Sequence, residues 1–155
     1  MMVSCGVNRN LTILIVEDNS NDVLLLQKAL TKAGITNPVR VVEDGVDAIN
    51  YLRGADKFKD RAEFPFPSVI FTDLKMPRMG GFEVLEWLRS HPECSVLPVI
   101  VFTNSRIDED IRRAYQLGAN SYIVKPQEFE KFVELLRVTY EYWSWCEKPF
   151  VPPNC

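Results

Sequence analysis

The chain has 155 residues and a formal net charge of −3, with 46% hydrophobic and 25% charged residues. This length and composition are those of one folded globular domain rather than of a disordered chain. The apolar runs are short, whereas a bilayer-spanning helix needs about 20 apolar residues, so the sequence predicts no membrane span. No block of Lys or Arg stands out, which argues against nucleic acid as a partner.

The first ten residues do not resemble a secretory signal, since residues 1–10 contain one Arg and no long apolar core. We expect them to form an N-terminal extension. The four cysteines are Cys5, Cys94, Cys146 and Cys155. None lies at C-x-x-C spacing from another, and the single His91 completes no zinc pattern, so we expect free thiols in a reducing cytoplasm.

Short apolar, β-branched segments alternate with longer segments of helical period. Five segments are predicted strands: Thr12–Val16, Val39–Val42, Ser68–Thr72, Val99–Thr103 and Ser121–Val124. Four of these are continuous apolar runs, which is typical of strands buried on both faces of a parallel sheet. Helices are predicted over about Ser20–Ala33, Val46–Arg53, Phe82–Ser90, from after Ser105 to Gly118, and over Glu128–Trp145. The alternation predicts a doubly wound α/β fold with strand order 2-1-3-4-5.

The connecting segments carry three further signals. Glu43 and Asp44 follow the second strand, which lies at the edge of the sheet, so we expect them to be solvated loop residues. Asp108 lies three residues after Ser105, a spacing that predicts a capping box at the start of the fourth helix. The segment Gly54–Pro67 has mixed charge and two prolines, and is predicted to be a surface loop.

Charged or hydroxyl-bearing residues stand at the ends of four of the five predicted strands. Glu17 and Asp18 follow the first strand and Asp73 follows the third. Thr103 ends the fourth strand, and Lys125 follows the fifth. In an open parallel sheet, ligands bind beyond the carboxyl ends of the strands, so this edge is the candidate site.

Three converging carboxylates repel one another, and a divalent cation such as Mg²⁺ or Mn²⁺ would remove the conflict. Lys125 supplies a further positive charge. A carboxylate that faces both stays ionised and nucleophilic, and phosphoryl transfer needs mainly positioning and charge neutralisation. The pattern therefore indicates that Asp73 is a phosphoryl acceptor, with the Thr103 hydroxyl as a hydrogen-bond donor to the phosphoryl group.

Four blocks together resemble the response-regulator receiver family: Ile13–Asp18, Thr72–Gly81, Val101–Ser105 and Tyr122–Pro126. The resemblance extends from about Leu11 to Tyr140 and implies a flavodoxin-like three-layer sandwich. It divides the chain into an N-terminal extension (1–10), a receiver domain (11–146) and a C-terminal tail (147–155). It also implies a non-enzyme that catalyses only its own phosphorylation and autodephosphorylation within a phosphorelay.

The resemblance assigns roles to the residues at the sheet edge. Asp73 accepts the phosphoryl group from a phosphohistidine of a sensor histidine kinase. Asp18, Asp73 and the backbone carbonyl of Lys75 hold the metal directly, and Glu17 acts mostly through water. Lys125 pairs with the phosphoryl group.

A switch between two surface states is also implied. Thr103 moves onto the phosphoryl oxygen and Tyr122 turns inward behind it, so that the fourth helix, fifth strand and fifth helix present a changed face to a partner. The peptide bond between Lys125 and Pro126 is usually cis in this family. Two departures stand out: Asn104 replaces the usual small residue, and Lys75 and Ser105 occupy variable positions that influence phosphate lifetime.

Gly54–Pro67 and Tyr140–Trp143 narrow the resemblance to stand-alone regulators paired with bacterial phytochrome histidine kinases, which often form dimers. The fifth helix carries a core stripe and a second apolar stripe on its opposite side: Leu135, Val138, Tyr142 and Trp145. A surface helix normally has one such stripe, so we expect the second to form a homodimer or a partner-docking surface. The alternative is that the tail Pro149–Cys155 folds back over it.

Each residue also has an ordinary structural explanation. Asp73 alone could be a turn acid, and Glu17 and Asp18 could cap the first helix. Thr103 could be a buried strand residue and Tyr122 a core aromatic. Two other functions stay open: a phosphorylation-independent scaffold or dimerisation module, and an aspartyl-phosphate phosphohydrolase. The second is disfavoured because such enzymes need an acid two residues after the nucleophile, where this chain has Lys75.

Overall fold

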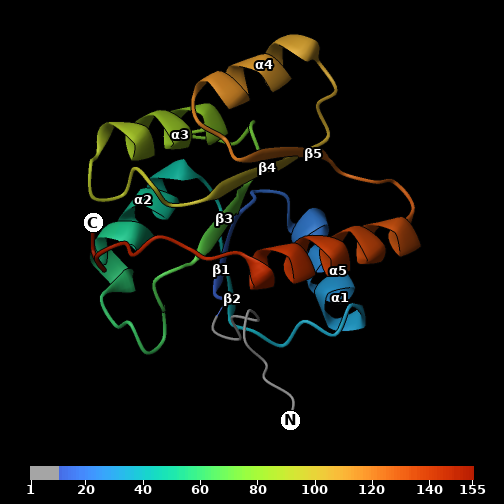
Figure 1. Cartoon of the computed structure of the whole chain (residues 1–155), viewed down its shortest axis with the longest axis horizontal. Coiled ribbons are helices and arrows are strands. Elements are labelled where there is room, and N and C mark those ends of the chain that lie inside the picture. Colours follow the sequence, from blue (N-terminus) through green and yellow to red (C-terminus); the bar gives the residue numbers. More distant parts are fainter. Residues whose placement is uncertain (1–10) are drawn as a thin grey trace.

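The computed structural model describes residues 11–155, which form a sheet of five parallel strands in the order β2-β1-β3-β4-β5 (Figure 1). The strands are β1 (Ile13–Val16), β2 (Val39–Val42), β3 (Val69–Thr72), β4 (Val99–Thr103) and β5 (Ser121–Val124). The helices are α1 (Ser20–Lys32), α2 (Gly45–Arg53), the short 3₁₀ helix η1 (Asp56–Phe58), α3 (Gly81–Ser90), α4 (Asp108–Gln116) and α5 (Phe129–Trp145). The predicted fold class, strand order and order of strands and α-helices are confirmed, with boundaries within about two residues, and only η1 was not predicted.

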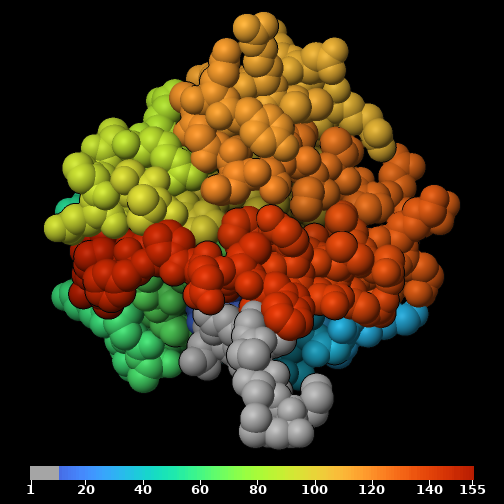
Figure 2. Space-filling view, viewed as in Figure 1, coloured from blue at the N-terminus to red at the C-terminus, as the bar shows by residue number. Residues whose placement is uncertain are grey.

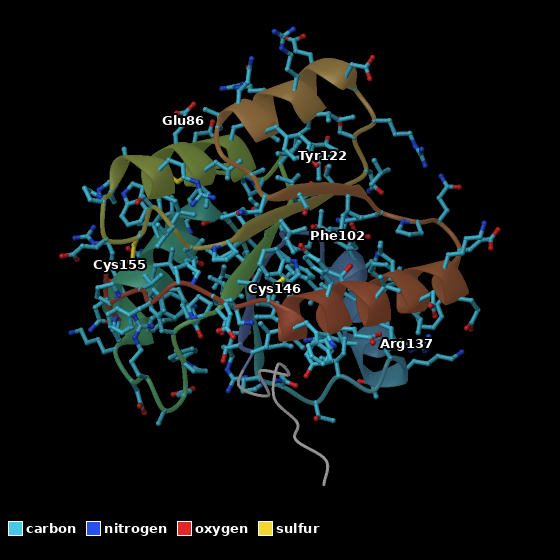
Figure 3. The ribbon with its side chains drawn as sticks, viewed as in Figure 1. Glu86, Phe102, Tyr122, Arg137, Cys146 and Cys155 are labelled. Atoms are coloured by element: carbon cyan, nitrogen blue, oxygen red, sulfur yellow. A yellow bond between two sulfur atoms is a disulfide. The ribbon has the colours of Figure 1, made fainter. Side chains whose placement is uncertain are left out.

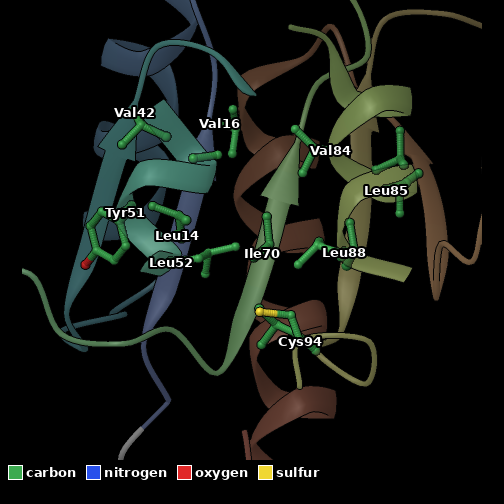
Figure 4. Close-up of a cluster of buried hydrophobic side chains, with 14 of the residues drawn as sticks. Leu14, Val16, Val42, Tyr51, Leu52, Ile70, Val84, Leu85, Leu88 and Cys94 are labelled. Carbon is green, nitrogen blue, oxygen red and sulfur yellow. The ribbon is translucent and has the colours of Figure 1, made fainter. Parts of the chain in front are cut away.

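Helices cover both faces of the sheet and bury two separate apolar clusters. The helices α1 and α5 pack on one face, where Leu26, Phe132 and Leu136 meet residues of the strands. The other face carries α2, α3 and α4, and Figure 4 shows part of this cluster around Leu14 and Ile70. Because successive strand residues alternate between the faces, strands buried on both sides must be apolar throughout, as their sequences are.

Side-chain caps fix where two of the helices begin. The Asn19 side chain accepts hydrogen bonds from the amides of Asn21 and Asp22 and so begins α1. Asp44 caps α2 by accepting from the Asp47 amide at 2.9 Å. The cap of α1 is therefore Asn19, and not Glu17 or Asp18, which sequence reasoning considered as possible caps.

The expectation that Asp44 is a solvated loop residue is wrong. Its side chain is only 5% exposed, and it accepts a hydrogen bond from Arg78 Nε at 2.7 Å. Burial acts to raise the pKa of Asp44, but the Arg78 guanidinium and the amides at the helix start outweigh it and hold the pKa below its ordinary value. Asp44 therefore ties α2 to the loop after β3 instead of facing solvent.

The capping box predicted for α4 is also absent. The helix begins at Asp108, and Ile107 precedes it without a side-chain cap. Ser105 instead accepts from the Ile107 amide at 3.3 Å and donates to Asp110 Oδ2 at 2.7 Å. A cluster of acids lies in the first turn, where it interacts favourably with the positive end of the helix dipole. The helix therefore begins two residues later than it would with a capping box at Ser105.

The Gly54–Pro67 segment is more structured than the surface loop that its composition predicted. It contains η1, whose Phe58 is 3% exposed. The Phe58 ring lies 5.1 Å from the ring of Tyr51 and 5.1 Å from that of Phe64, measured between centroids. This aromatic group extends the core beneath α2, so the segment is partly a packed element.

The C-terminal residues run from the end of α5 back toward α2, as the red trace in Figure 1 shows. Val151 packs against the cluster on the α2 and α3 face, and Cys155 forms a disulfide with Cys94. The prediction of free thiols is therefore wrong for this pair, because the fold brings together two cysteines that lie 61 residues apart. Cys146 is free, whereas Cys5 and the predicted extension 1–10 lie outside the described residues.

Because the tail runs toward α2, the second stripe of α5 is left uncovered by it. Val138, Tyr142 and Trp145 remain 54%, 63% and 58% exposed. Leu135 differs, since it is half-buried and packs against the core on the α1 side. The exposed stripe consists of Val138, Tyr142 and Trp145. No helix within residues 11–155 has the length and apolar character that crossing a bilayer requires.

Candidate functional site

Asp73 stands directly after β3, and its backbone and side chain are both held in place. Its amide donates to the Val16 carbonyl at 3.0 Å, which continues the pairing of β3 with β1. Its Oδ1 accepts from the Leu74 amide at 2.7 Å. The carboxylate therefore points in a fixed direction beyond the carboxyl edge of the sheet, with Oδ2 free of this turn.

The ammonium of Lys125 brings three carboxylates together. Its Nζ donates to Glu17 Oε2 at 2.9 Å, to Asp73 Oδ2 at 3.2 Å and to Asp22 Oδ2 at 3.4 Å. The Lys125 amide donates to the Thr103 carbonyl at 2.8 Å, so β4 positions the start of this side chain. With its side chain only 12% exposed, Lys125 is a buried counter-ion for acids from β1, α1 and β3.

The acids at this edge share the charge unequally. Burial raises the pKa of Glu17 to about 7, and the neighbouring Asp73 adds to this, while Lys125 opposes it. Burial also acts to raise the pKa of Asp73, but Lys125, the Thr103 hydroxyl and the Leu74 amide outweigh it and keep the pKa below its ordinary value. Burial acts to lower the pKa of Lys125, yet its two acidic partners leave it raised. Asp73 is therefore ionised near neutral pH, whereas Glu17, with a pKa of about 7, is only partly ionised there.

Thr103 ends β4 with its side chain facing Asp73. It is 4% exposed, and its side chain helps to lower the pKa of Asp73. The same oxygen accepts from the Ser105 amide at 3.3 Å. The hydroxyl thus lies between the acceptor carboxylate and the loop that leads to α4. The neighbouring Asn104 is exposed and lines the cavity beside the site.

Tyr122 lies between β5 and α4, where Figure 3 labels it. Its hydroxyl donates to the Ser105 carbonyl at 2.9 Å, and its amide donates to the Tyr115 hydroxyl of α4 at 3.1 Å. Burial raises the pKa of its phenol. Hydrogen bonds thus connect Thr103, Ser105 and Tyr122, and they reach α4 through Tyr115.

Two of the predicted site residues stand apart from this cluster. Asp18 is exposed and does not contact Lys125, and Lys75 is exposed in the loop after β3. Asp22 takes a place beside Lys125 that sequence reasoning did not give it. The signal was available, since an acid four residues after Asp18 in the first turn of α1 lies above the end of β1.

No group of three or more His, Cys, Asp or Glu side chains within residues 11–155 is arranged to hold a metal ion. The Lys125 ammonium lies between Glu17 and Asp73 and supplies positive charge there. The cis peptide that the resemblance implied before Pro126 is also absent, because the described residues contain no cis peptide bond. A trans X-Pro bond is the form that the isolated amide prefers.

A cavity of about 270 Å³ opens beside the carboxylates, between α1 and α5. Asp73 and Lys125 line one side of it, and apolar side chains such as Leu25, Phe102 and Phe129 line the rest. Figure 3 labels Phe102, which lies on the face of the sheet that α5 covers. The cavity gives a small group direct access to the Asp73 carboxylate.

The sequence matches the family model of the response regulator receiver domain over residues 13–137. A similar curated protein is the probable methanogenesis regulatory protein FilR2 of Methanothrix harundinacea (strain 6Ac). It is 34% identical over 138 residues, which cover 88% of this chain and 86% of that protein.

The fold is also that of several solved structures. Response regulator RPA3017 in red light signalling of R. palustris is 33% identical, with a TM-score of 0.86 over 91% of this chain and 99% of that one. The phosphorylated cyanobacterial phytochrome response regulator RcpA is 32% identical, with a TM-score of 0.80 over 91% and 99%. The Mn²⁺-bound form of response regulator Rcp1, a protein of Synechocystis sp. PCC 6803, is 28% identical, with a TM-score of 0.75 over 91% and 98%.

Proposed function

The chain belongs to the response-regulator receiver family of two-component signalling, and from this we propose that Asp73 accepts a phosphoryl group from a histidine kinase. The observation that carries the proposal is the state of the Asp73 carboxylate. It is ionised, held by the Leu74 amide on one oxygen and by Lys125 on the other, and reached through an open cavity. Phosphorylated RcpA, a structural neighbour, supports the same role.

The proposed reaction is a displacement at phosphorus. A carboxylate oxygen of Asp73 forms the new P–O bond while the P–N bond of a phosphohistidine breaks, and the imidazole nitrogen keeps the electron pair. Lys125 is already within 3.2 Å of Asp73 and neutralises charge on the phosphoryl oxygens. The Thr103 hydroxyl, at the end of β4, is placed to donate to one of them. Positioning and charge neutralisation are the main requirements of phosphoryl transfer.

A divalent cation fits the donor set by its chemistry. The pKa of about 7 for Glu17 means that Lys125 alone does not balance the buried acids. We assign the carboxylates of Asp18 and Asp73 and the Lys75 carbonyl as the oxygen ligands that would hold Mg²⁺ or Mn²⁺, with Glu17 acting mostly through water. When bound, the ion supplies positive charge to the phosphoryl oxygens. The Mn²⁺-bound Rcp1 structure supports this assignment.

The signal leaves the site through Thr103 and Tyr122. A phosphoryl group on Asp73 competes for the Thr103 hydroxyl, which also accepts from the Ser105 amide. Displacement of Ser105 would break its hydrogen bond with Tyr122, whose amide in turn holds Tyr115 of α4. The face formed by α4, β5 and α5 therefore reads the phosphorylation state, and its output is contact with another protein in the cytoplasm.

Two partners follow from the exposed surfaces and from the neighbours. The phytochrome regulators among the solved structures favour a phytochrome-like sensor kinase as the phosphoryl donor. The exposed stripe of Val138, Tyr142 and Trp145 on α5 supports a homodimer, because contiguous exposed apolar and aromatic area marks a contact surface. Leu135, also predicted on this stripe, is half-buried against the core.

The direct test is incubation with Mg²⁺ and acetyl phosphate, followed by intact-mass measurement. We expect one acid-labile phosphoryl group on the wild type and none on Asp73→Asn, with Asp47→Asn as a matched control that keeps the wild-type level. Turnover of external phosphomonoesters would instead identify a phosphohydrolase. If the wild type gains no phosphoryl group from acetyl phosphate, and if adding beryllofluoride does not change the protein, the chain is a scaffold. Such a result would refute the proposal.

A further inference from the structure

The disulfide between Cys94 and Cys155 connects the tail to the end of the sheet opposite the proposed phosphorylation site. The two Cα atoms lie 5.7 Å apart, which is within the range that a disulfide spans without backbone movement. Cys94 lies in the loop before β4, at the base of the cluster in Figure 4. Figure 2 shows α5 and the tail as one continuous orange-to-red band across the face of the molecule.

Cys94 is the fixed half of this pair. It is fully buried, and its amide donates to the His91 carbonyl at 2.9 Å while its carbonyl accepts from the Leu97 amide at 3.1 Å. Arg89 closes the same turn by donating to the carbonyls of Ser95 and Leu97 at 2.8 and 2.9 Å. The turn keeps its shape without the disulfide, because none of these hydrogen bonds involves the tail.

Cys155 is the movable half, since residues 147–155 form neither helix nor strand. Besides the disulfide, Val151 is half-buried against the core and Asn154 accepts from Arg61 Nε at 2.9 Å. Arg61 also donates to backbone carbonyls of α2, at Tyr51 and Leu52, and so is itself fixed. The tail is thus held by one covalent bond and a small number of weaker contacts.

We propose that Cys94 and Cys155 form a reversible redox site whose reduction by a protein dithiol releases the tail 147–155 from the α2 side of the fold. The asymmetry of the pair carries the proposal. A rigid buried thiol and a partly exposed thiol on an irregular segment can separate and re-form their bond without unfolding the domain.

The exchange balances as a two-electron reduction. A thiolate of the dithiol attacks the Cys155 sulfur, which is the more accessible of the two, and the bond to Cys94 breaks. The Cys94 sulfur leaves with the electron pair and takes a proton. The second thiol of the reductant then displaces Cys155 from the mixed disulfide, so the protein gains two thiols and the reductant becomes a disulfide.

The test uses the full chain with Cys5→Ser and Cys146→Ser, which leaves only the pair in question. After denaturing quench, a maleimide should label no thiol in the oxidised protein and two in the reduced protein, appearing together across a series of glutathione buffers. Hydrogen exchange of residues 147–155 should become about tenfold faster on reduction, with the strands unchanged. Labelling of both thiols in fully oxidised buffer, or unchanged tail exchange on reduction, would overturn the proposal.

A second variant separates a redox site from a merely structural bond. Asn154→Ala removes the hydrogen bonds from Arg61 that hold Cys155 near Cys94. We expect the disulfide to become about fivefold easier to reduce at equilibrium, because the local concentration of the two thiols falls. Phe150→Ala is the matched control, since this tail residue is 84% exposed and should leave the equilibrium unchanged. Equal equilibria for wild type and Asn154→Ala would contradict a tail-dependent site.

Discussion

The two ends of the sheet are built from different interactions. At the carboxyl end, three charged residues lie close together in a partly buried place: Glu17, Asp73 and Lys125. Burial and the neighbouring charges shift the pKa of Glu17. At the opposite end, the disulfide between Cys94 and Cys155 and the hydrogen bonds of Arg61 hold the tail on the fold. Arg61 is the charged group here, and its partner Asn154 is neutral. We propose that the carboxyl end receives a charged group, whereas the opposite end stabilises the fold. A substitution at either end should therefore leave the other end nearly unaffected.

Lys125→Met should have the largest effect, and this effect should be confined to the carboxyl end. Loss of the ammonium leaves Asp73 without the group that lowers its pKa and neutralises the incoming phosphoryl group. The rate of phosphorylation by acetyl phosphate should fall about 100-fold. Rapid-quench mass spectrometry measures the rate, and thiol labelling should find the disulfide intact. A rate within a factor of two of wild type would contradict the proposed role of Lys125 in phosphorylation at the carboxyl end.

Cys155→Ser should act at the opposite end, on stability alone. The disulfide closes a loop with a sequence separation of 61, for which the loop-entropy model gives at most about 4 kcal/mol. The melting temperature should fall by about 5 to 15 °C. Calorimetry with Cys146→Ser as the control measures this shift. Phosphorylation at 25 °C should proceed at the wild-type rate, and a loss of phosphorylation there would show that the two ends are coupled.

Glu17→Gln should test how the charged groups at the carboxyl end affect the pH dependence of stability. The folded pKa of Glu17, about 7, lies above its ordinary value of 4.5, so the folded state holds the proton more tightly. The stability this contributes is complete below pH 4.5 and is lost as the pH rises through 7. In metal-free buffer, the wild type should lose about 1–2 kcal/mol of unfolding free energy across this window, after allowance for solvent screening.

The variant should lose little across the same window, because glutamine carries no titrating proton. Urea unfolding at several pH values measures both curves. Asp73 does not interfere, since its lowered pKa places its own transition below its ordinary value of 3.8. Parallel curves for Glu17→Gln and wild type would mean that Glu17 is charged throughout this range.

The smallest expected effect concerns α5, the helix that connects the two ends. Tyr142→Glu with Trp145→Glu places charge on the exposed stripe without touching the core residues of the helix. Light scattering should report a lower mass for this variant than for wild type, with unchanged melting temperature. A wild type that is already monomeric would remove the dimer from the proposed function.

Sequence reasoning recovered the features that depend on local pattern. Continuous apolar strands separated by helical segments fix a doubly wound sheet, and the chain direction then brings Glu17, Asp73, Thr103 and Lys125 to one edge. It misjudged features that depend on side-chain direction. Asp44 turned out to be a buried cap, and Leu135 a core residue. Asp22 joined the acids at Lys125 because the first turn of α1 points it inward.

The sequence by itself determined the alternation of strands and helices and the chemistry at the carboxyl ends of the strands, because both follow from short-range periodicity and from which residue ends each strand. Only the tertiary structure decided the pairing of Cys94 with Cys155, the path of the tail, and which acids meet the Lys125 ammonium. These contacts join segments tens of residues apart. Their formation depends on the distances and packing of the folded chain, which no local pattern encodes.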